Sequence, residues 1–313
     1  MGHLYTTREN YTAEQLKEMK GKYLPTELIC CTASREIEDG EIMFVGIGIS
    51  DLAGAIAKLV YAPNSLMVAE AGYIGFAGIS TMFSPADDWG ATMAMCHQGL
   101  PETFIDQQAG LIDVAYLGFA QIDMFGNVNV SYITGPKIRM NGSGGGGDIA
   151  SSAGRIVYTV EFNARSYVKK LDYMTEPGFF DGSPDARNKQ NLVGGGPSCV
   201  VTNRGVFRFD VETHEMYLAE VFPWQDKADI EEVRKAFPWN LKVARELKII
   251  APPTERELWV MRLMDPLGLW TVARVLDTTL GKLVLSGKHD IEAYNALEEG
   301  REAAWRKALE IVT

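Results

Sequence analysis

The hydrophobic pattern of the N-terminal half predicts an α/β arrangement. Residues 42–45 and 66–69 are short apolar runs of strand length, and the alanine-rich segment 51–59 between them has a helical composition. A turn containing Gly46 and Gly48 joins the first run to this segment. Two strands connected by a glycine turn and a helix form a βαβ unit, which predicts a parallel sheet covered by helices on both faces.

Helices are predicted where capping residues precede segments without breakers. Thr12 and Gln15 have capping-box spacing in front of a helix at 13–20. Ser50 or Asp51 is the expected N-cap of the alanine-rich helix. The further predicted elements are a helix at 28–37, a polar break at 106–110, an apolar run at 111–120, a turn at 123–127, a helix opening at Asp148 and a strand at 156–161.

The last third of the chain is predicted to contain short strands joined by turns, followed by helices. Three short β-like runs at 199–202, 206–210 and 216–221 are separated by turn residues, a pattern typical of hairpins. A second capping box at Thr254 and Glu257 opens a helix to Met264, and residues 290–309 are predicted to form an amphipathic helix. We expect an α/β fold with an open, mostly parallel sheet flanked by helices and antiparallel strands added late. Residues 1–266 would form this domain and residues 267–313 a helical C-terminal extension.

The composition of the chain limits the cellular compartments and the classes of partner that are expected for it. The 313-residue chain has a formal net charge of −11, which argues against nucleic acid or an anionic membrane as its main partner. We find no signal peptide and no apolar stretch of the roughly 18–20 residues that a membrane-spanning helix needs. The four cysteines have no paired spacing. A reduced, cytoplasmic protein without structural zinc or another metal is therefore expected.

Glu70 is the first candidate for chemistry. It follows directly after the apolar run 66–69 and precedes two small residues, Ala71 and Gly72. Ligands of open parallel sheets bind beyond the carboxyl ends of the strands, so this carboxylate is placed where a substrate could approach it closely. The alternative is a glutamate that caps a turn or pairs with a lysine.

The glycine-rich segment 142–147 is the second candidate. Glycines let the backbone approach a ligand and point several N–H groups at it, and a helix opening at Asp148 would add its positive end. A phosphate or a developing oxyanion would suit such a loop, whereas the alternative is a flexible turn. Cys96 and His97 could form a dyad, but neighbouring residues in an extended segment point apart, so a packed histidine is favoured.

Several segments together resemble class I coenzyme A transferases, in particular the small (β) subunit of the glutaconate type. The resemblance runs roughly from residue 10 to residue 266. The segments that carry it are Val60-Tyr61-Ala62-Pro63 before Glu70, Gln121-Ile122-Asp123 with Gly126-Asn127-Val128-Asn129, Gly142-Ser143-Gly144-Gly145, Asp172-Tyr173 with Pro177-Gly178 and Asp181-Gly182, and the hairpin at 200–218.

The resemblance implies covalent catalysis by Glu70. The nucleophile of this family is the glutamate of a Glu-Ser-Gly sequence, and the present chain has alanine in place of the serine. The reaction would pass through a mixed anhydride and a glutamyl-CoA thioester, with a coenzyme A thioester as substrate and no cofactor. By the same resemblance, the oxyanion and CoA-binding residues are Gly46, Gly48, Gly144, Gly145, Gly146 and Gly147, and the substrate-pocket residues are Ala71, Gly72, Gln121, Asn127 and Ser143.

The resemblance also implies a partner. Two related chains share one active site in glutaconate-type enzymes, so we expect a larger α-type subunit and an α₂β₂ or larger hetero-oligomer. The first expected substrates are an acyl-CoA and a carboxylic acid, with a dicarboxylate as first choice. The alternatives are an acyl-CoA hydrolase, a ring-opening carbon–carbon hydrolase acting on CoA thioesters, and a structural subunit without chemistry of its own.

Overall fold

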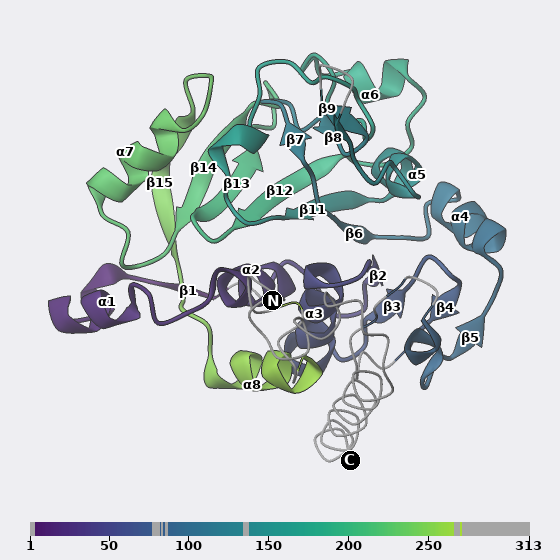
Figure 1. Ribbon diagram of the computed structural model, residues 1–313, viewed down its shortest axis with the longest axis horizontal. Helices are drawn as coiled ribbons and strands as arrows, with labels where there is room; N and C mark the ends of the chain where they lie inside the picture. Colours follow the sequence, from purple (N-terminus) through teal and green to yellow (C-terminus); the bar gives the residue numbers. More distant parts are fainter. Residues whose placement is uncertain are drawn as a thin grey trace.

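The computed structural model describes residues 4–76, 82, 84, 87–133, 138–265 and 270, and an eleven-stranded sheet forms its centre (Figure 1). In order across the sheet, the strands are β1 (Tyr5–Thr6), β15 (Lys242–Ile250), β14 (Met216–Val221), β13 (Gly205–Phe209), β12 (Pro197–Thr202), β11 (Arg155–Thr159), β6 (Val114–Leu117), β2 (Ile42–Phe44), β3 (Leu66–Val68), β4 (Tyr73–Ile74) and β5 (Cys96–His97). The neighbours β3, β2, β6, β11 and β12 run parallel. This parallel centre confirms the predicted α/β fold class.

Antiparallel strands flank the parallel centre on both sides. β12, β13 and β14 pair antiparallel, which confirms the predicted hairpins. At the opposite end β4 and β5 pair antiparallel beyond β3, so the sheet is mixed at both edges. The sequence did not predict these two strands because each has two residues, too few to display a hydrophobic period. Two small separate hairpins are β7 (Gln121–Ile122) with β8 (Val128–Asn129) and β9 (Tyr132–Ile133) with β10 (Ile138–Arg139).

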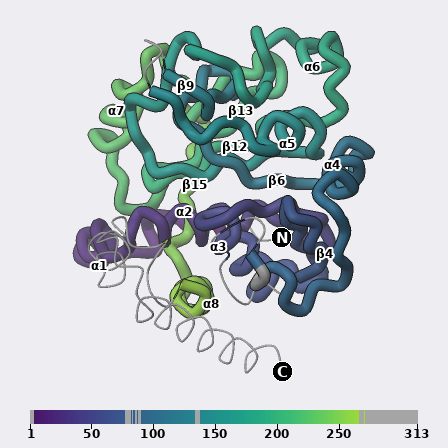
Figure 2. The backbone as a smooth tube through the Cα atoms, turned by 45° about the vertical axis from the view of Figure 1, so that its right-hand side comes forward, coloured from purple at the N-terminus to yellow at the C-terminus, as the bar shows by residue number. Residues whose placement is uncertain are grey.

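Helices cover both faces of the sheet, as Figures 1 and 2 show. On one side α2 (Pro25–Ser34), α3 (Ile49–Ile56) and α8 (Glu255–Met264) pack against one another. On the other side lie α5 (Gly146–Ser152) and α7 (Lys227–Lys235). The remaining helical segments are α1 (Ala13–Met19), α4 (Leu100–Gln108), α6 (Ala186–Lys189), the short 3-10 segments Arg8–Asn10, Asp88–Ala91 and Ala164–Ser166, and a π-turn at Ala57–Tyr61.

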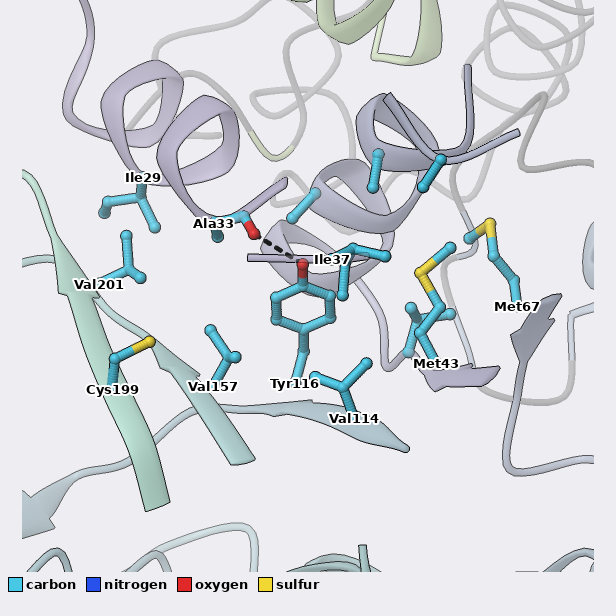
Figure 3. Packing of buried hydrophobic residues seen from close by; sticks show 14 of the residues in the cluster. Ile29, Ala33, Ile37, Met43, Met67, Val114, Tyr116, Val157, Cys199 and Val201 are labelled. Atoms are coloured by element: carbon cyan, nitrogen blue, oxygen red, sulfur yellow. Dashed lines mark hydrogen bonds between the residues drawn. The ribbon is translucent and has the colours of Figure 1, made fainter. Parts of the chain in front are cut away.

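Successive strand residues contribute to different layers of the core. On β11 and β12, Val157 and Cys199 face α2, whereas Tyr158 and Val200 belong to the cluster on the opposite face. Tyr116 on β6 is 1% exposed and donates a hydrogen bond of 2.8 Å to the carbonyl oxygen of Ala33 on α2 (Figure 3). The tyrosine satisfies its buried hydroxyl in this way and fixes the helix layer to the centre of the sheet.

Several predicted element boundaries differ from the structure. α2 begins at Pro25, which suits the first turn because proline has no N–H to satisfy there, and it ends at Ser34. The N-cap of α3 is Gly48 rather than Ser50 or Asp51, and its backbone φ is +74°. The predicted polar break at 106–110 is wrong over its first part, because α4 runs to Gln108. α5 begins at Gly146 rather than at Asp148.

The predicted C-terminal helix at 290–309 lies outside the described residues. Of the segment 267–313, the structure describes Trp270, whose backbone N–H donates to Asp265 Oδ2 at 2.8 Å. The domain boundary at residue 266 therefore stays a prediction. Within the described part of the chain, no helix has the length and hydrophobicity needed to cross a bilayer.

Candidate active site

Glu70 occupies a tight turn at the carboxyl end of β3. The N–H of Gly72 donates to the carbonyl oxygen of Ala69 at 2.9 Å, which places Glu70 and Ala71 at the centre of the turn. Gly72 has φ +95°, and a β-carbon on it would lie 1.9 Å from the carbonyl oxygen of Gln98. No side chain fits there, so glycine is required to lead the chain into β4. The turn leaves the Glu70 side chain half-buried at the edge of the sheet.

The glycine-rich segment reaches Glu70 from a distant part of the chain. The N–H of Gly146 donates to the carbonyl oxygen of Ser143 at 2.8 Å, so residues 143–146 form a turn that leads into α5. A β-carbon on Gly145 would lie 3.0 Å from Glu70 Oε1 and 2.3 Å from Phe104 Cζ. The structure therefore brings the carboxylate and the loop, two of the candidates from the sequence, close together. Phe104 adds an apolar wall beside them.

Gly46 and Gly48 lie at the same edge of the sheet. They follow β2, which pairs parallel with β3 through Phe44 and Val68. A β-carbon on Gly48 would lie 3.0 Å from the Trp270 ring. Parallel strands present their carboxyl ends on one side, so this turn borders the site on the neighbouring strand.

Glu176 is a second carboxyl group at the glycine loop, and the sequence did not predict it. A β-carbon on Gly146 would lie 2.4 Å from Glu176 Oε1. The Glu176 side chain is buried, and this burial raises its pKa to about 8, while the hydroxyl of Tyr158 acts in the opposite direction. No spacing in the sequence relates Glu176 to the loop. Glu176 lies between Asp172-Tyr173 and Pro177-Gly178, two short segments that carry part of the family resemblance, and this neighbourhood is the one signal that the sequence offered.

Gln121 and Asn127 are buried and engaged with the segment that contains Glu176. Gln121 Nε2 donates to Asp172 Oδ2 at 2.7 Å. Asn127 Oδ1 accepts hydrogen bonds from the N–H groups of Gly178 at 2.9 Å and Phe180 at 3.0 Å. Both side chains thus attach the 172–180 segment to the β7–β8 hairpin. Their role in a substrate pocket stays a prediction, as does that of the exposed Ser143.

The remaining sequence candidates do not form a second centre. Cys96 and His97 are neighbours on β5, so their side chains leave the strand in opposite directions. The His97 ring lies edge-on to Tyr73, with 5.3 Å between the ring centroids. Among the described residues, no group of three histidine, cysteine, aspartate or glutamate side chains converges as a metal site would require.

The sequence is similar to that of known coenzyme A transferases. The profile of the Coenzyme A transferase family matches residues 27–232. The chain is 31% identical over 247 residues to the B-type subunit of 3-oxoadipate CoA-transferase from Pseudomonas knackmussii, which covers 78% of this chain and 94% of that relative. It is 32% identical over 243 residues to the B-type subunit of glutaconate CoA-transferase from Acidaminococcus fermentans, covering 74% and 88%.

The fold is similar to that of solved structures in the same group. The crystal structure of glutaconate coenzyme A-transferase from Acidaminococcus fermentans superposes with a TM-score of 0.72 at 29% identity, over 81% of this chain and 99% of that chain. The decarboxylase AibA/AibB superposes with a TM-score of 0.64 at 21% identity, over 77% and 95%, which shows a shared fold. Since the family profile spans most of the described chain and both relatives exceed 30% identity, the chain belongs to the coenzyme A transferase family and is an enzyme of that type.

Proposed function

We propose that this chain is the β-type subunit of a heteromeric CoA-transferase in which Glu70 forms a covalent glutamyl-CoA thioester. The observation that carries the proposal is the proximity of the Glu70 carboxylate to the glycine loop at Gly145. The proposed nucleophile and a source of backbone N–H donors lie together at the carboxyl edge of a parallel sheet. There the carboxylate can attack a carbonyl carbon, and the N–H groups can stabilise the oxyanion that forms.

The reaction would begin with attack of a Glu70 carboxylate oxygen on the thioester carbonyl carbon of an acyl-CoA. Collapse of the tetrahedral intermediate breaks the carbon–sulfur bond and gives a mixed anhydride with free CoA thiolate. The thiolate then attacks the glutamyl carbonyl carbon, which forms the Glu70 thioester and releases the first acid as a carboxylate. An acceptor carboxylate reverses these steps, so one acyl-CoA and one acid are exchanged for another pair.

The residues around Glu70 would support these steps without taking part in bond formation. The absence of a side chain at Gly145 lets the backbone of the loop lie close to Glu70 Oε1 and Phe104, and loop N–H groups would stabilise the oxyanion. Phe104 packs at 6.4 Å from Phe44, centroid to centroid, and forms an apolar wall. Such a wall would limit the access of water, which would otherwise hydrolyse the anhydride.

A partner chain would complete the site. The two relatives matched over most of this chain are both named as one type of subunit of a CoA-transferase. The net charge of −11 disfavours binding of the polyphosphate part of coenzyme A by this chain alone, so a second, larger α-type chain would contribute many of the contacts that bind coenzyme A. We propose an α₂β₂ or larger assembly, located in the cytoplasm. 3-Oxoadipate and glutaconate, which name the two relatives, are both dicarboxylates, which supports a dicarboxylate as one of the acids exchanged.

Mass analysis of the reconstituted complex tests this function. The complex with its partner chain is mixed with a panel of acyl-CoA thioesters, including dicarboxylic ones, then digested and searched for a CoA-sized adduct on the peptide that contains Glu70. The adduct is expected in the wild type and absent in Glu70→Gln, which keeps the shape of the side chain but removes the nucleophile. Free CoA without adduct and without need for an acceptor acid would establish hydrolysis instead. Full turnover by Glu70→Gln would mean that this chain has a structural role.

A further inference from the structure

Glu176 is a buried carboxyl group that the proposed reaction does not use. It is 2% exposed, and its Oε1 packs against the backbone of Gly146. The preceding residue, Gly145, is the one that lies beside Glu70. Its own backbone is fixed on both sides: the Glu176 N–H donates to the Val128 carbonyl oxygen at 3.1 Å, and the Val128 N–H donates to the Glu176 carbonyl oxygen at 2.9 Å. The glycine loop thus lies between two carboxyl groups, Glu70 and Glu176.

Arg187 holds the segment after Glu176 against the helix that follows the loop. Its Nη1 donates to the carbonyl oxygens of Pro177 and Gly178, both at 3.0 Å. Its Nη2 donates to the carbonyl oxygens of Ala150 at 2.9 Å and Ser151 at 3.2 Å, in the last turn of α5. One guanidinium group therefore ties both elements together, and the backbone that carries Glu176 cannot move away from α5 without breaking these bonds.

Burial, and not nearby charge, favours the neutral form of Glu176. Tyr158 of β11 faces it, and the nearby charges that act on that tyrosine are those of Glu176, Arg187 and Asp123. Arg187 uses its donors on backbone carbonyl oxygens, and no ion pair joins Glu176 to a lysine or arginine in the described ranges. Burial raises the pKa of Glu176 to about 8, so the group is protonated at neutral pH.

We infer that Glu176 is a positioning residue, whose carboxyl group packs behind Gly146 and keeps the glycine loop at the distance from Glu70 that the oxyanion requires. The inference rests on the proposed function of Glu70. Only the uncharged carboxyl serves this purpose. An ionised Glu176 would compete for the N–H groups of the loop and would add negative charge behind the site where the oxyanion develops.

The pH dependence of thioester formation tests the inference. In the wild-type complex, the rate of adduct formation on Glu70 is expected to fall by about tenfold per pH unit above a pH of about 8, as Glu176 loses its proton. Glu176→Gln keeps the size of the side chain and cannot ionise, so its rate should stay level over the same range. Glu161→Gln makes the same chemical change at an exposed position and should retain the wild-type profile.

A compensation experiment tests the contact separately. In Gly146→Ala the new β-carbon would meet Glu176 Oε1 at 2.4 Å and displace the loop, whereas Glu176→Ala removes the support behind it. Each change should slow adduct formation, and the double variant should recover at least about tenfold over the slower single variant, because the added methyl group fills the vacated space. This cycle remains informative if Glu176→Gln does not fold.

The outcomes separate the two hypotheses. Identical alkaline profiles in wild type and Glu176→Gln, or additive losses in the double variant, would overturn the positioning role while leaving adduct formation intact. Failure of the wild-type complex to form any adduct over the range from about pH 6 to about pH 10 would refute the covalent function of Glu70, and the inference would fall with it. A level profile for Glu176→Gln together with recovery in the double variant would support both.

Discussion

Glu70 Oε1 lies 3.0 Å from the point that a β-carbon on Gly145 would occupy. The two residues come from distant parts of the chain, one from the turn after β3 and the other from the loop before α5. The proximity means that a single methyl group on the loop would alter the space around the carboxylate that we propose as the nucleophile. Under the proposed function, glycine at this position would therefore have a chemical consequence in addition to a structural one.

Gly145→Ala should reduce adduct formation on Glu70 by about 100-fold, because the new methyl group would displace the carboxylate or the loop by a fraction of an ångström to one ångström. The same methyl group would overlap Phe104 Cζ at 2.3 Å, so the free energy of unfolding should fall by about 1–3 kcal/mol. Quantitative mass analysis of the adduct and urea unfolding measure the two effects.

Gly147→Ala provides the matched control. Its β-carbon would lie 3.4 Å from the Thr175 carbonyl oxygen, an ordinary contact, and it belongs to α5. Alanine is the better helix former by about 1 kcal/mol and keeps the backbone N–H, so this variant should keep its stability and lose far less adduct formation than Gly145→Ala. An equal loss of activity in both variants would show that the contact with Glu70 has no special effect.

Gly72→Ala should destabilise the fold by about 2–4 kcal/mol, because alanine is strained at φ +95° and its β-carbon would meet the Gln98 carbonyl oxygen at 1.9 Å. The hairpin that presents Glu70 would have to open. Gly46→Ala is the control, since no described atom lies within 4 Å of its β-carbon position and its φ is not in the left-handed range. Urea unfolding should show a change below about 0.5 kcal/mol for that control. Equal stability of the two variants would contradict the structure of the turn.

Local patterns explain why the βαβ unit and the hairpins could be predicted from the sequence. Residues 42–69 contain local signals for strands and a turn, namely two apolar runs of strand length and a glycine turn. Glu70 comes directly after the second run, so its place at the end of a strand could be predicted as well. The same holds for β12, β13 and β14, where turn residues separate adjacent runs.

The errors arise where tertiary contacts override local composition. Gln107 was predicted to lie in a polar break, yet it is 0% exposed on α4 and donates to the Ile149 carbonyl oxygen at 3.5 Å. Gly48 starts α3 through its backbone conformation and so replaces the expected side-chain cap. The approach of Glu176 to Gly146 is a contact between distant segments, and a single sequence contains no periodicity that reveals it.

Glu257→Gln should lower the free energy of unfolding by about 3–5 kcal/mol. Glu257 is 0% exposed and binds Arg35 with both carboxylate oxygens, through Nε and Nη2, each at 2.7 Å, and this pair joins the end of α2 to the start of α8. Removing the negative charge leaves the Arg35 guanidinium buried without its counterion. Urea unfolding of the isolated chain measures the change.

Glu232→Gln is the corresponding change at the surface. Glu232 pairs with Arg204, but the two side chains are 66% and 33% exposed, so solvent screens the interaction. The change should cost less than about 1 kcal/mol. A small effect for both substitutions would mean that the pair of Arg35 and Glu257 is hydrated in solution.

Cysteine reactivity should distinguish the exposed edge strand from the core. Cys96 on β5 is exposed, whereas Cys30, Cys31 and Cys199 are buried, and burial raises the pKa of the Cys199 thiol well above its usual value. Iodoacetamide should modify Cys96 alone in the folded chain at pH 8, and all four cysteines after denaturation in urea. Mass analysis of the peptides identifies the sites. Rapid labelling of Cys30 would contradict the close packing of α2 against α3.

The unfolding free energy of Glu176→Gln relative to wild type should depend on pH. The pKa of Glu176 is raised from 4.5 to about 8 in the folded chain, so wild-type stability from this group is complete below about pH 4.5 and is lost as the pH rises towards 8. The difference between variant and wild type should therefore grow in favour of the variant by about 1.4 kcal/mol per pH unit over this window and then level off.

Other titrating groups are present in both proteins and cancel in this difference. Urea unfolding at several pH values measures it, with Glu161→Gln as the exposed control that should show no such slope. If the difference between Glu176→Gln and wild type does not change with pH, Glu176 is ionised in the folded chain. The glycine loop would then have a negative charge behind it at neutral pH, and the role of Glu176 as an uncharged support for the loop would be refuted independently of any assay of the reaction.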